Sequence, residues 1–101
     1  MKTPEQQLQR LVLDWLSAEG IFAIRFNTGA VKQGNRFIRF GTAGCADVLA
    51  CPAYKPPVWI ELKSQTGRQT VEQKSFQMAV ESAGHVYRLA RSLEEVQEVL
   101  G

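Results

Sequence analysis

Apolar residues near the N-terminus recur with the period of a helix. Thr3-Pro4-Glu5-Gln6 combines a capping-box pattern with proline at the first helical position. Downstream, apolar side chains return every three or four residues and form one stripe, which comprises Leu8, Leu11, Val12, Trp15 and Leu16. The pattern predicts an amphipathic helix that ends at Glu19-Gly20.

Alternation of apolar and polar residues then replaces the helical period. Residues 21–27 predict a first strand, and residues 36–41, which alternate imperfectly, predict its hairpin partner. The segment 28–35 between them has glycines near both ends and is interpreted as a loop. Two further strands are predicted at 47–51 and 58–63, joined by a proline-rich turn.

The last third of the chain predicts a helix, a strand and a short helix. Thr70-Val71-Glu72-Gln73 repeats the capping-box pattern, and Gly84 marks the end of this helix. The predicted apolar face of the helix comprises Phe76, Ala79, Val80 and Ala83. A strand follows at 85–90, and Ser92 caps the final helix. At 101 residues the chain is expected to be one domain, with a mixed α/β sheet flanked by helices.

Three charged residues stand within strands that should be buried. Asp47 opens the run DVLAC, and Glu61 and Lys63 interrupt the run VWIELK. Because side chains alternate along a strand, Glu61 and Lys63 share the face of Trp59, opposite Leu62. Burying such charges without partners costs on the order of several kcal/mol each. We therefore expect partners for them, and Asp47 on the preceding strand is the obvious candidate.

Two carboxylates that converge from adjacent strands offer hard oxygen ligands. Such ligands favour Mg²⁺ or Mn²⁺ over zinc. A divalent ion and a neighbouring lysine together suffice for the hydrolysis of a phosphodiester. The E-x-K spacing by itself fits a structural ion pair or a solvated strand face equally well.

The positive charge of the chain is unevenly distributed. The formal net charge is only +2, but segment 20–46 has no acidic residue and carries four basic ones: Arg25, Lys32, Arg36 and Arg39. A basic end of the fold suits a polyanionic partner, although a solvated hairpin with ordinary surface arginines gives the same pattern. Arg68 and Lys74 lie near the E-x-K strand and are further candidates for phosphate contact.

The order of these features resembles a known nuclease family. Glu5 on the first helix, followed by GCAD, IELK and TVEQ, is similar to the VRR-NUC domain of the PD-(D/E)XK superfamily. The resemblance spans Glu5 to about Ser92 and includes the stretch FNTGAV…RFG. It implies a restriction-endonuclease-like α-β-β-β-α-β core, here with an extra hairpin strand and a C-terminal helix. Ala46 stands where members often have a proline.

The resemblance assigns roles to five residues. It implies that Asp47 and Glu61 are metal ligands and that Lys63 is the catalytic base or an electrostatic helper. It places Gln73 beside the site and lets Glu5 reach the metal or its water shell. The helix pattern also points Glu5 inward, although a favourable charge in the first helical turn explains it equally well. The second half of a capping box likewise explains Gln73.

The family implies a Mg²⁺- or Mn²⁺-dependent endonuclease acting on DNA. Its stand-alone members are expected to be homodimers that resemble Holliday-junction resolvases, with roles in DNA repair, recombination or phage DNA processing. Two alternatives remain open: a nuclease directed at flaps or nicks, and a non-catalytic DNA-binding or assembly module with a structural Asp/Glu/Lys cluster. No stretch reaches the roughly 20 apolar residues of a membrane span, and the polar N-terminus lacks the apolar region of a secretion signal, so a cytoplasmic location is expected. With the family's roles, a bacterial or phage-encoded protein is expected.

Overall fold

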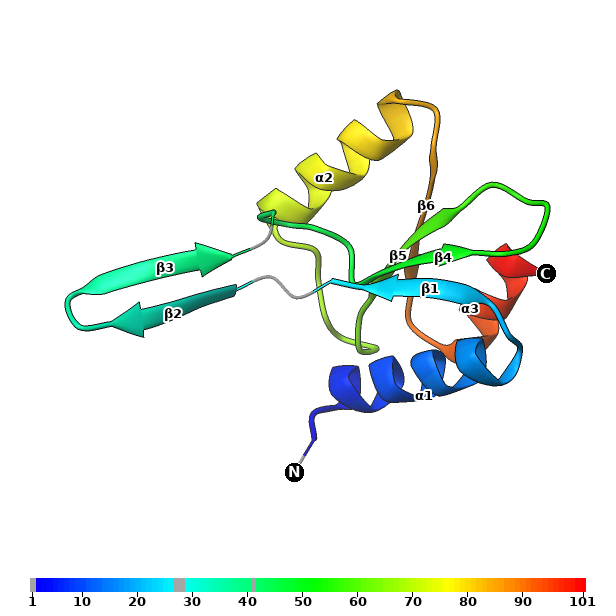
Figure 1. Cartoon of the computed structure of the whole chain (residues 1–101), viewed down its shortest axis with the longest axis horizontal. Helices are drawn as coiled ribbons and strands as arrows, with labels where there is room; N and C mark the ends of the chain where they lie inside the picture. Colours follow the sequence, from blue (N-terminus) through cyan, green and yellow to red (C-terminus); the bar gives the residue numbers. More distant parts are fainter. Residues whose placement is uncertain (1, 27–28, 41) are drawn as a thin grey trace.

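The computed structural model describes residues 2–26, 29–40 and 42–101, with strands 29–33 and 36–40 described as backbone. Figure 1 shows how the helices and strands are arranged. In chain order the elements are α1 (Pro4–Ala18), β1 (Phe22–Arg25), β2 (Gly29–Gln33), β3 (Arg36–Phe40), β4 (Val48–Cys51), β5 (Val58–Leu62), α2 (Val71–Ser82), β6 (Val86–Ala90) and α3 (Leu93–Leu100).

Four of the strands form one mixed sheet. Their order is β1-β4-β5-β6, in which β1–β4 and β4–β5 are antiparallel and β5–β6 is parallel. Helix α2 supplies the crossover that a parallel pair requires. Strands β2 and β3 form a separate hairpin that extends away from this sheet (Figure 1). The expected mixed α/β sheet flanked by helices is confirmed.

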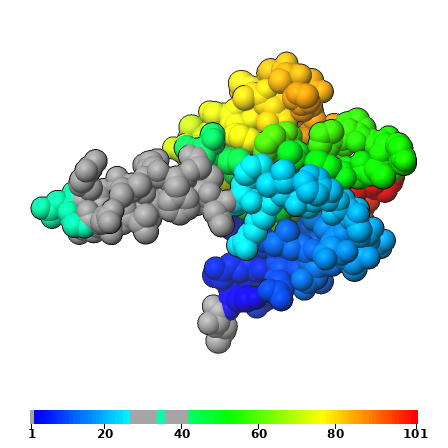
Figure 2. All heavy atoms as spheres, in the orientation of Figure 1, coloured from blue at the N-terminus to red at the C-terminus, as the bar shows by residue number. Residues whose placement is uncertain are grey.

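Helices cover both faces of the four-stranded sheet. Val48 and Ile60 belong to the larger buried cluster, together with Val12 of α1 and Val96 of α3. On the opposite face Tyr87 belongs to a smaller cluster with α2 residues. Figure 2 shows α2 in yellow and α1 in blue on opposite sides of the green strands. The strict alternation of β5 therefore sends its aliphatic side chains to one layer and its charged ones to the other.

The predicted helix boundaries are confirmed by their caps. Thr3 and Gln6 form a reciprocal capping box at α1, and Thr70 and Gln73 form another at α2. Helix α2 ends at Ser82 and is terminated by Gly84, whose φ of 85° lies in the left-handed region that favours glycine. None of the helices within the described ranges has the length and apolar character of a membrane span.

The loop before β4 packs tightly against the start of α2. Gly44 has a φ of 76°, and a Cβ atom placed there would lie 2.2 Å from the carbonyl oxygen of Glu72. Only a residue without a side chain permits this close approach of two backbones. The contact holds the loop that leads into Asp47 at a fixed distance from α2.

The predicted pairing of the hairpin was wrong. Residues 36–40 pair with residues 29–33, which were expected to be a loop, and β1 pairs with β4 instead. The reason is the tight turn at Gly34-Asn35, where Gly34 has a φ of 64°. A two-residue turn of this kind joins adjacent strands directly, so β3 pairs with the segment immediately before the turn.

Several apolar positions are more exposed than their periodicity predicted. Leu11 of the predicted α1 stripe is 51% exposed, and Ala79 and Ala83 of the predicted α2 face are exposed as well. Phe22 and Ile24 of β1 are 66% and 41% exposed. β1 is an edge strand, and neither residue belongs to the smaller cluster under α2. Helix α2 therefore does not cover the face of the sheet that Phe22 and Ile24 occupy.

Candidate active site

Asp47 and Glu61 lie opposite each other on neighbouring strands. The β4–β5 register pairs Val48 with Ile60, so the preceding Asp47 faces Glu61 across the two strands. The Asp47 N–H donates to the Ile60 carbonyl oxygen at 3.0 Å, which holds the backbone just before β4 against β5. Side chains of directly opposed residues project to the same face of a sheet. The Glu61 carboxylate raises the pKa of Asp47, so the two carboxylates lie near each other, while their functional roles stay predictions.

The environment of Asp47 disfavours its negative charge. Burial raises the pKa of its carboxyl group, and the carboxylates of Glu5 and Glu61 raise the pKa further. Two interactions lower the pKa of Asp47 but are weaker in sum. The Leu62 N–H donates to Asp47 Oδ2 at 2.7 Å, and the Lys63 ammonium attracts the Asp47 carboxylate. A carboxylate held under these conditions gains stability from any cation that binds beside it.

Glu61 is fully buried, and its two oxygens differ in their partners. Oε1 accepts hydrogen bonds from Gln69 Nε2 at 2.9 Å and from the Tyr87 hydroxyl. Oε2 has no hydrogen-bond donor among the described residues, although Lys63 Nζ lies 3.8 Å away. An unsatisfied buried oxygen of this kind costs about 1–3 kcal/mol. The carboxylate is thus fixed through one oxygen and left open at the other.

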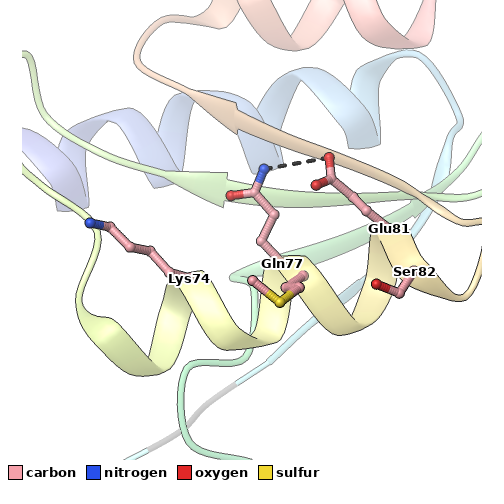
Figure 3. Close-up of a pocket in the computed structure, with 5 residues that line it drawn as sticks. Lys74, Gln77, Glu81 and Ser82 are labelled. Carbon is pink, nitrogen blue, oxygen red and sulfur yellow. Dashed lines mark hydrogen bonds between the residues drawn. The ribbon is translucent and has the colours of Figure 1, made fainter.

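The donors to Glu61 are themselves held by other side chains. Burial, followed by the hydrogen bond to Glu61, raises the pKa of the Tyr87 hydroxyl, so it remains a proton donor. Gln69 Nε2 also donates to Gln77 Oε1 at 2.8 Å, and Gln77 Nε2 donates to Glu81 Oε2 at 3.4 Å (Figure 3). This amide chain connects the exposed side of α2 to the buried carboxylate.

Lys63 lies between two carboxylates at the end of β5. Its Nζ is 3.8 Å from Glu61 Oε2 and 3.9 Å from Oε1 of Glu5, whose side chain is 48% exposed. The Lys63 N–H donates to the Ala90 carbonyl oxygen of β6 at 3.0 Å, which keeps this residue in the sheet. The ammonium group is therefore held beside the open oxygen of Glu61.

Comparisons with known proteins bear on the fold. No family model matches the chain, and no curated protein matches it. A solved structure described as a VRR_NUC domain is similar, with a TM-score of 0.70 and 15% sequence identity, over 97% of this chain and 95% of that chain. This chain has the VRR-NUC fold. The recognition from GCAD, IELK and TVEQ is thereby confirmed at the level of the fold.

Within the VRR-NUC fold, Gln73 has a capping role. Its Oε1 accepts a hydrogen bond from the Thr70 N–H at 2.9 Å, and its own N–H donates to Thr70 Oγ1 at 3.1 Å. The glutamine that contacts the Glu61 carboxylate is Gln69, four positions earlier. A functional role of Gln73 beside the site stays a prediction.

Sequence reasoning missed the two donors to Glu61. Gln69 lies in the loop before the α2 cap, where no periodicity indicates the direction of a side chain. Tyr87 could have been placed on the face of Trp59 by alternation, because these residues pair between β5 and β6. That inference requires the order of the strands, which the sequence did not provide.

The predicted DNA-contacting residues are spread over several elements. Arg25 is exposed at the end of β1, and Arg68 is exposed in the loop after β5. Lys74 lies at the rim of an open hollow of about 430 Å³ on α2, together with Gln77 and Glu81 (Figure 3). For the remaining three predicted residues the structure describes only the backbone: Lys32, Arg36 and Arg39.

The residues present fit an open site for a magnesium-like ion better than a site in which protein side chains supply every ligand. Within the described ranges, no group of three or more His, Cys, Asp or Glu side chains is placed to hold a metal. Asp47 and Glu61 form a pair, and the pair has an open oxygen on Glu61. Mg²⁺ typically takes one or two carboxylates and completes its shell with water and substrate phosphates. Glu5 as a third ligand stays a prediction.

The hydrogen bond from Tyr87 to Glu61 yields a stability prediction. We expect Tyr87→Phe to lower the free energy of unfolding by about 1.5–3 kcal/mol, because a buried carboxylate loses one of its two donors. The matched control Tyr54→Phe removes the same hydroxyl from a fully exposed side chain and should change stability by less than about 0.5 kcal/mol. Urea unfolding of the three proteins measures both values. Equal stability of the two variants would contradict the assigned hydrogen bond.

Proposed function

We propose that this chain is a Mg²⁺- or Mn²⁺-dependent endonuclease that hydrolyses phosphodiester bonds of DNA. The observation that carries the proposal is the converging pair Asp47 and Glu61, with one open oxygen on Glu61 beside Lys63. A purely structural ion pair would be expected to satisfy all its buried oxygens. The unsatisfied oxygen and the raised pKa of Asp47 instead indicate a site prepared for a cation.

Asp47 and Glu61 would hold the divalent ion between them. When bound, the ion would polarise a phosphoryl oxygen of the substrate and stabilise the charge that develops on the leaving oxygen. Tyr87 and Gln69 act as positioning residues, because both donate to Oε1 of Glu61 and leave Oε2 free. Neither donor has to move when a cation arrives.

Lys63 would assist the attacking water. Its ammonium group lies beside the open oxygen of Glu61, so it can orient the water or neutralise negative charge on the phosphate. Glu5 holds this ammonium from the side of α1 at 3.9 Å. In this proposal Glu5 positions Lys63 and can also reach the water shell of the ion.

We further propose branched DNA, such as a four-way junction, as the preferred substrate and DNA repair, recombination or phage DNA processing as the setting. The basic segment from Arg25 to Arg39 would follow the DNA backbone with little base readout. A homodimer would offer two sites for paired cuts. The expectations of a single domain over residues 1–101 and of a cytoplasmic, bacterial or phage-encoded protein stay predictions.

The free edge of the sheet supports the dimer proposal. β1 is paired on one side only within the four-stranded sheet. Its Phe22 and Ile24 side chains are 66% and 41% exposed. An edge strand with exposed large apolar side chains is prone to pairing with another chain. A second copy docked along β1 would cover both residues.

The Asp47→Asn exchange should raise stability without metal and lower the stabilisation that Mn²⁺ provides. Because the pKa of Asp47 is raised above its ordinary 3.8, folding disfavours its ionised form, and stability is lost as pH rises through the folded pKa. Without metal, Asp47→Asn should therefore be more stable than the wild type near pH 7. The difference in stability should vanish when the pH falls below the ordinary aspartate pKa of 3.8. With Mn²⁺ at about 100 times its dissociation constant, the wild type should gain about 2.7 kcal/mol and the variant much less. Thermal unfolding with and without Mn²⁺ measures this, and equal gains in both proteins would contradict the metal site.

Cleavage tests the catalytic proposal. We expect the wild type with Mg²⁺ or Mn²⁺ to cut at least one of labelled four-way junction, flap, duplex and single-stranded DNA. Glu61→Gln should lower the rate by more than about 100-fold, since it removes a ligand charge. The control Glu98→Gln makes the same exchange in an exposed side chain of α3 and should leave the rate unchanged. If every protein binds DNA and none cuts, the DNA-binding module with a structural charge cluster replaces the nuclease.

The dimer proposal is tested by sedimentation. Phe22→Lys places a charge on the exposed apolar face of β1 and should convert a dimer into a monomer at micromolar concentration. Met78→Lys serves as the control, because Met78 is 68% exposed on α2, away from this edge. A wild type that is monomeric at all concentrations would contradict the dimer, and a dimer that survives Phe22→Lys would exclude the β1 edge.

A further inference from the structure

A basic hollow lies between the first helix and the first strand. It has a volume of about 240 Å³ and is lined by Lys2, Gln6, Gln9, Arg10, Leu13 and Arg25. Three of these side chains are cationic and none is acidic. Figure 2 shows the two enclosing elements side by side, α1 in blue and β1 in cyan. The hollow is separate from the carboxylate pair, and it includes two cations that the sequence analysis did not single out.

The cations of this hollow are only partly neutralised. Arg10 Nε lies 3.3 Å from Asp14 Oδ2, and both side chains are about two-thirds exposed. Arg25 donates through NH2 to the Gln9 amide oxygen at 3.4 Å, a neutral acceptor that uses one of its five N–H donors. Lys2 lines the same hollow and adds a third basic side chain. An anion that entered would therefore meet at least two positive charges without a carboxylate between them.

Both walls of the hollow continue along the chain into residues that contact the carboxylate site. On α1, Gln6 directly follows Glu5, which contacts Lys63. On β1, Arg25 directly precedes Phe26, whose N–H donates to the Asp47 carbonyl oxygen at 2.9 Å. The far lining residues Gln9 and Arg10 lie about one helical turn, or roughly 5 Å, beyond Gln6 along the α1 axis. A strand that enters the site can thus place a neighbouring phosphate in the hollow.

We propose that this hollow is a phosphate subsite that holds the DNA backbone next to the cleaved bond, with Arg25, Lys2 and Arg10 as its cations. The inference rests on the proposed nuclease function and adds to it a direction: the backbone leaves the site along α1 toward β1. Arginine suits the role because its planar fork binds phosphate oxygens through two parallel hydrogen bonds. Contacts of this kind set register and affinity without reading sequence.

Binding is measured in the Glu61→Gln background, so that cleavage does not interfere. The probe is a labelled four-way DNA junction, titrated at several salt concentrations. Arg25→Ala should weaken binding several-fold at about 50 mM salt and reduce the salt slope by about 1. Lys2→Ala should act in the same direction. Asp14→Asn should have the opposite effect, because it frees Arg10 from its ion pair and should tighten binding.

Arg88→Ala is the matched control. It removes the same charge from β6, at the other edge of the sheet, where Arg88 pairs with Glu98 at 3.2 Å. It should leave the affinity and the salt slope unchanged. Equal effects of Arg25→Ala and Arg88→Ala, or no effect of either, would overturn the subsite while leaving nuclease activity in the wild type intact. Failure of the Glu61→Gln parent to bind DNA, together with a wild type that does not cut, would overturn the subsite and the proposed function together.

Discussion

The register between β4 and β5 is the constraint on which the rest of the site depends. It pairs Val48 with Ile60, and both side chains are completely buried in the larger core cluster. A slip by one residue would turn the apolar side chains of one strand to the wrong face, so the core allows no such slip. The same register sets Asp47 opposite Glu61. The hydrophobic layer between the sheet and helices α1 and α3 thus fixes the geometry of a charged pair on the other face.

Burial of that pair has a cost that the surrounding residues offset only in part. Tyr87 and Gln69 satisfy one oxygen of Glu61, and Lys63 lies near the other without a hydrogen bond. Asp47 remains in surroundings that raise the pKa of its carboxyl group. Apolar residues in place of such a cluster would be expected to give equal or greater stability, because an ion pair rarely recovers the whole cost of burying its charges. Retention of the charged cluster is understood if a cation and a phosphate complete the arrangement.

Helices α1 and α2 act differently on this site. α2 carries Gln77, which supports Gln69, and its first turn packs against the backbone of Gly44 ahead of Asp47. It therefore holds the buried side of the carboxylates. α1 brings Glu5 to Lys63 on the exposed side, and its following turn forms one wall of the basic hollow. α2 thus supports the buried carboxylates, and α1 contributes the half-exposed Glu5.

The sequence alone determined the features that depend on neighbours along the chain. Capping boxes and periodicity placed the helices, and alternation placed Glu61 and Lys63 with Trp59, because these signals act within a few residues. The VRR-NUC fold followed from the order of short motifs. Tertiary structure decided the partner of β1, the roles of Gln69 and Tyr87, and the meeting of Arg25 with the α1 cations. The β2–β3 hairpin follows from the local turn at Gly34-Asn35, whereas the other features depend on which elements become neighbours, a choice made by burial of the whole core.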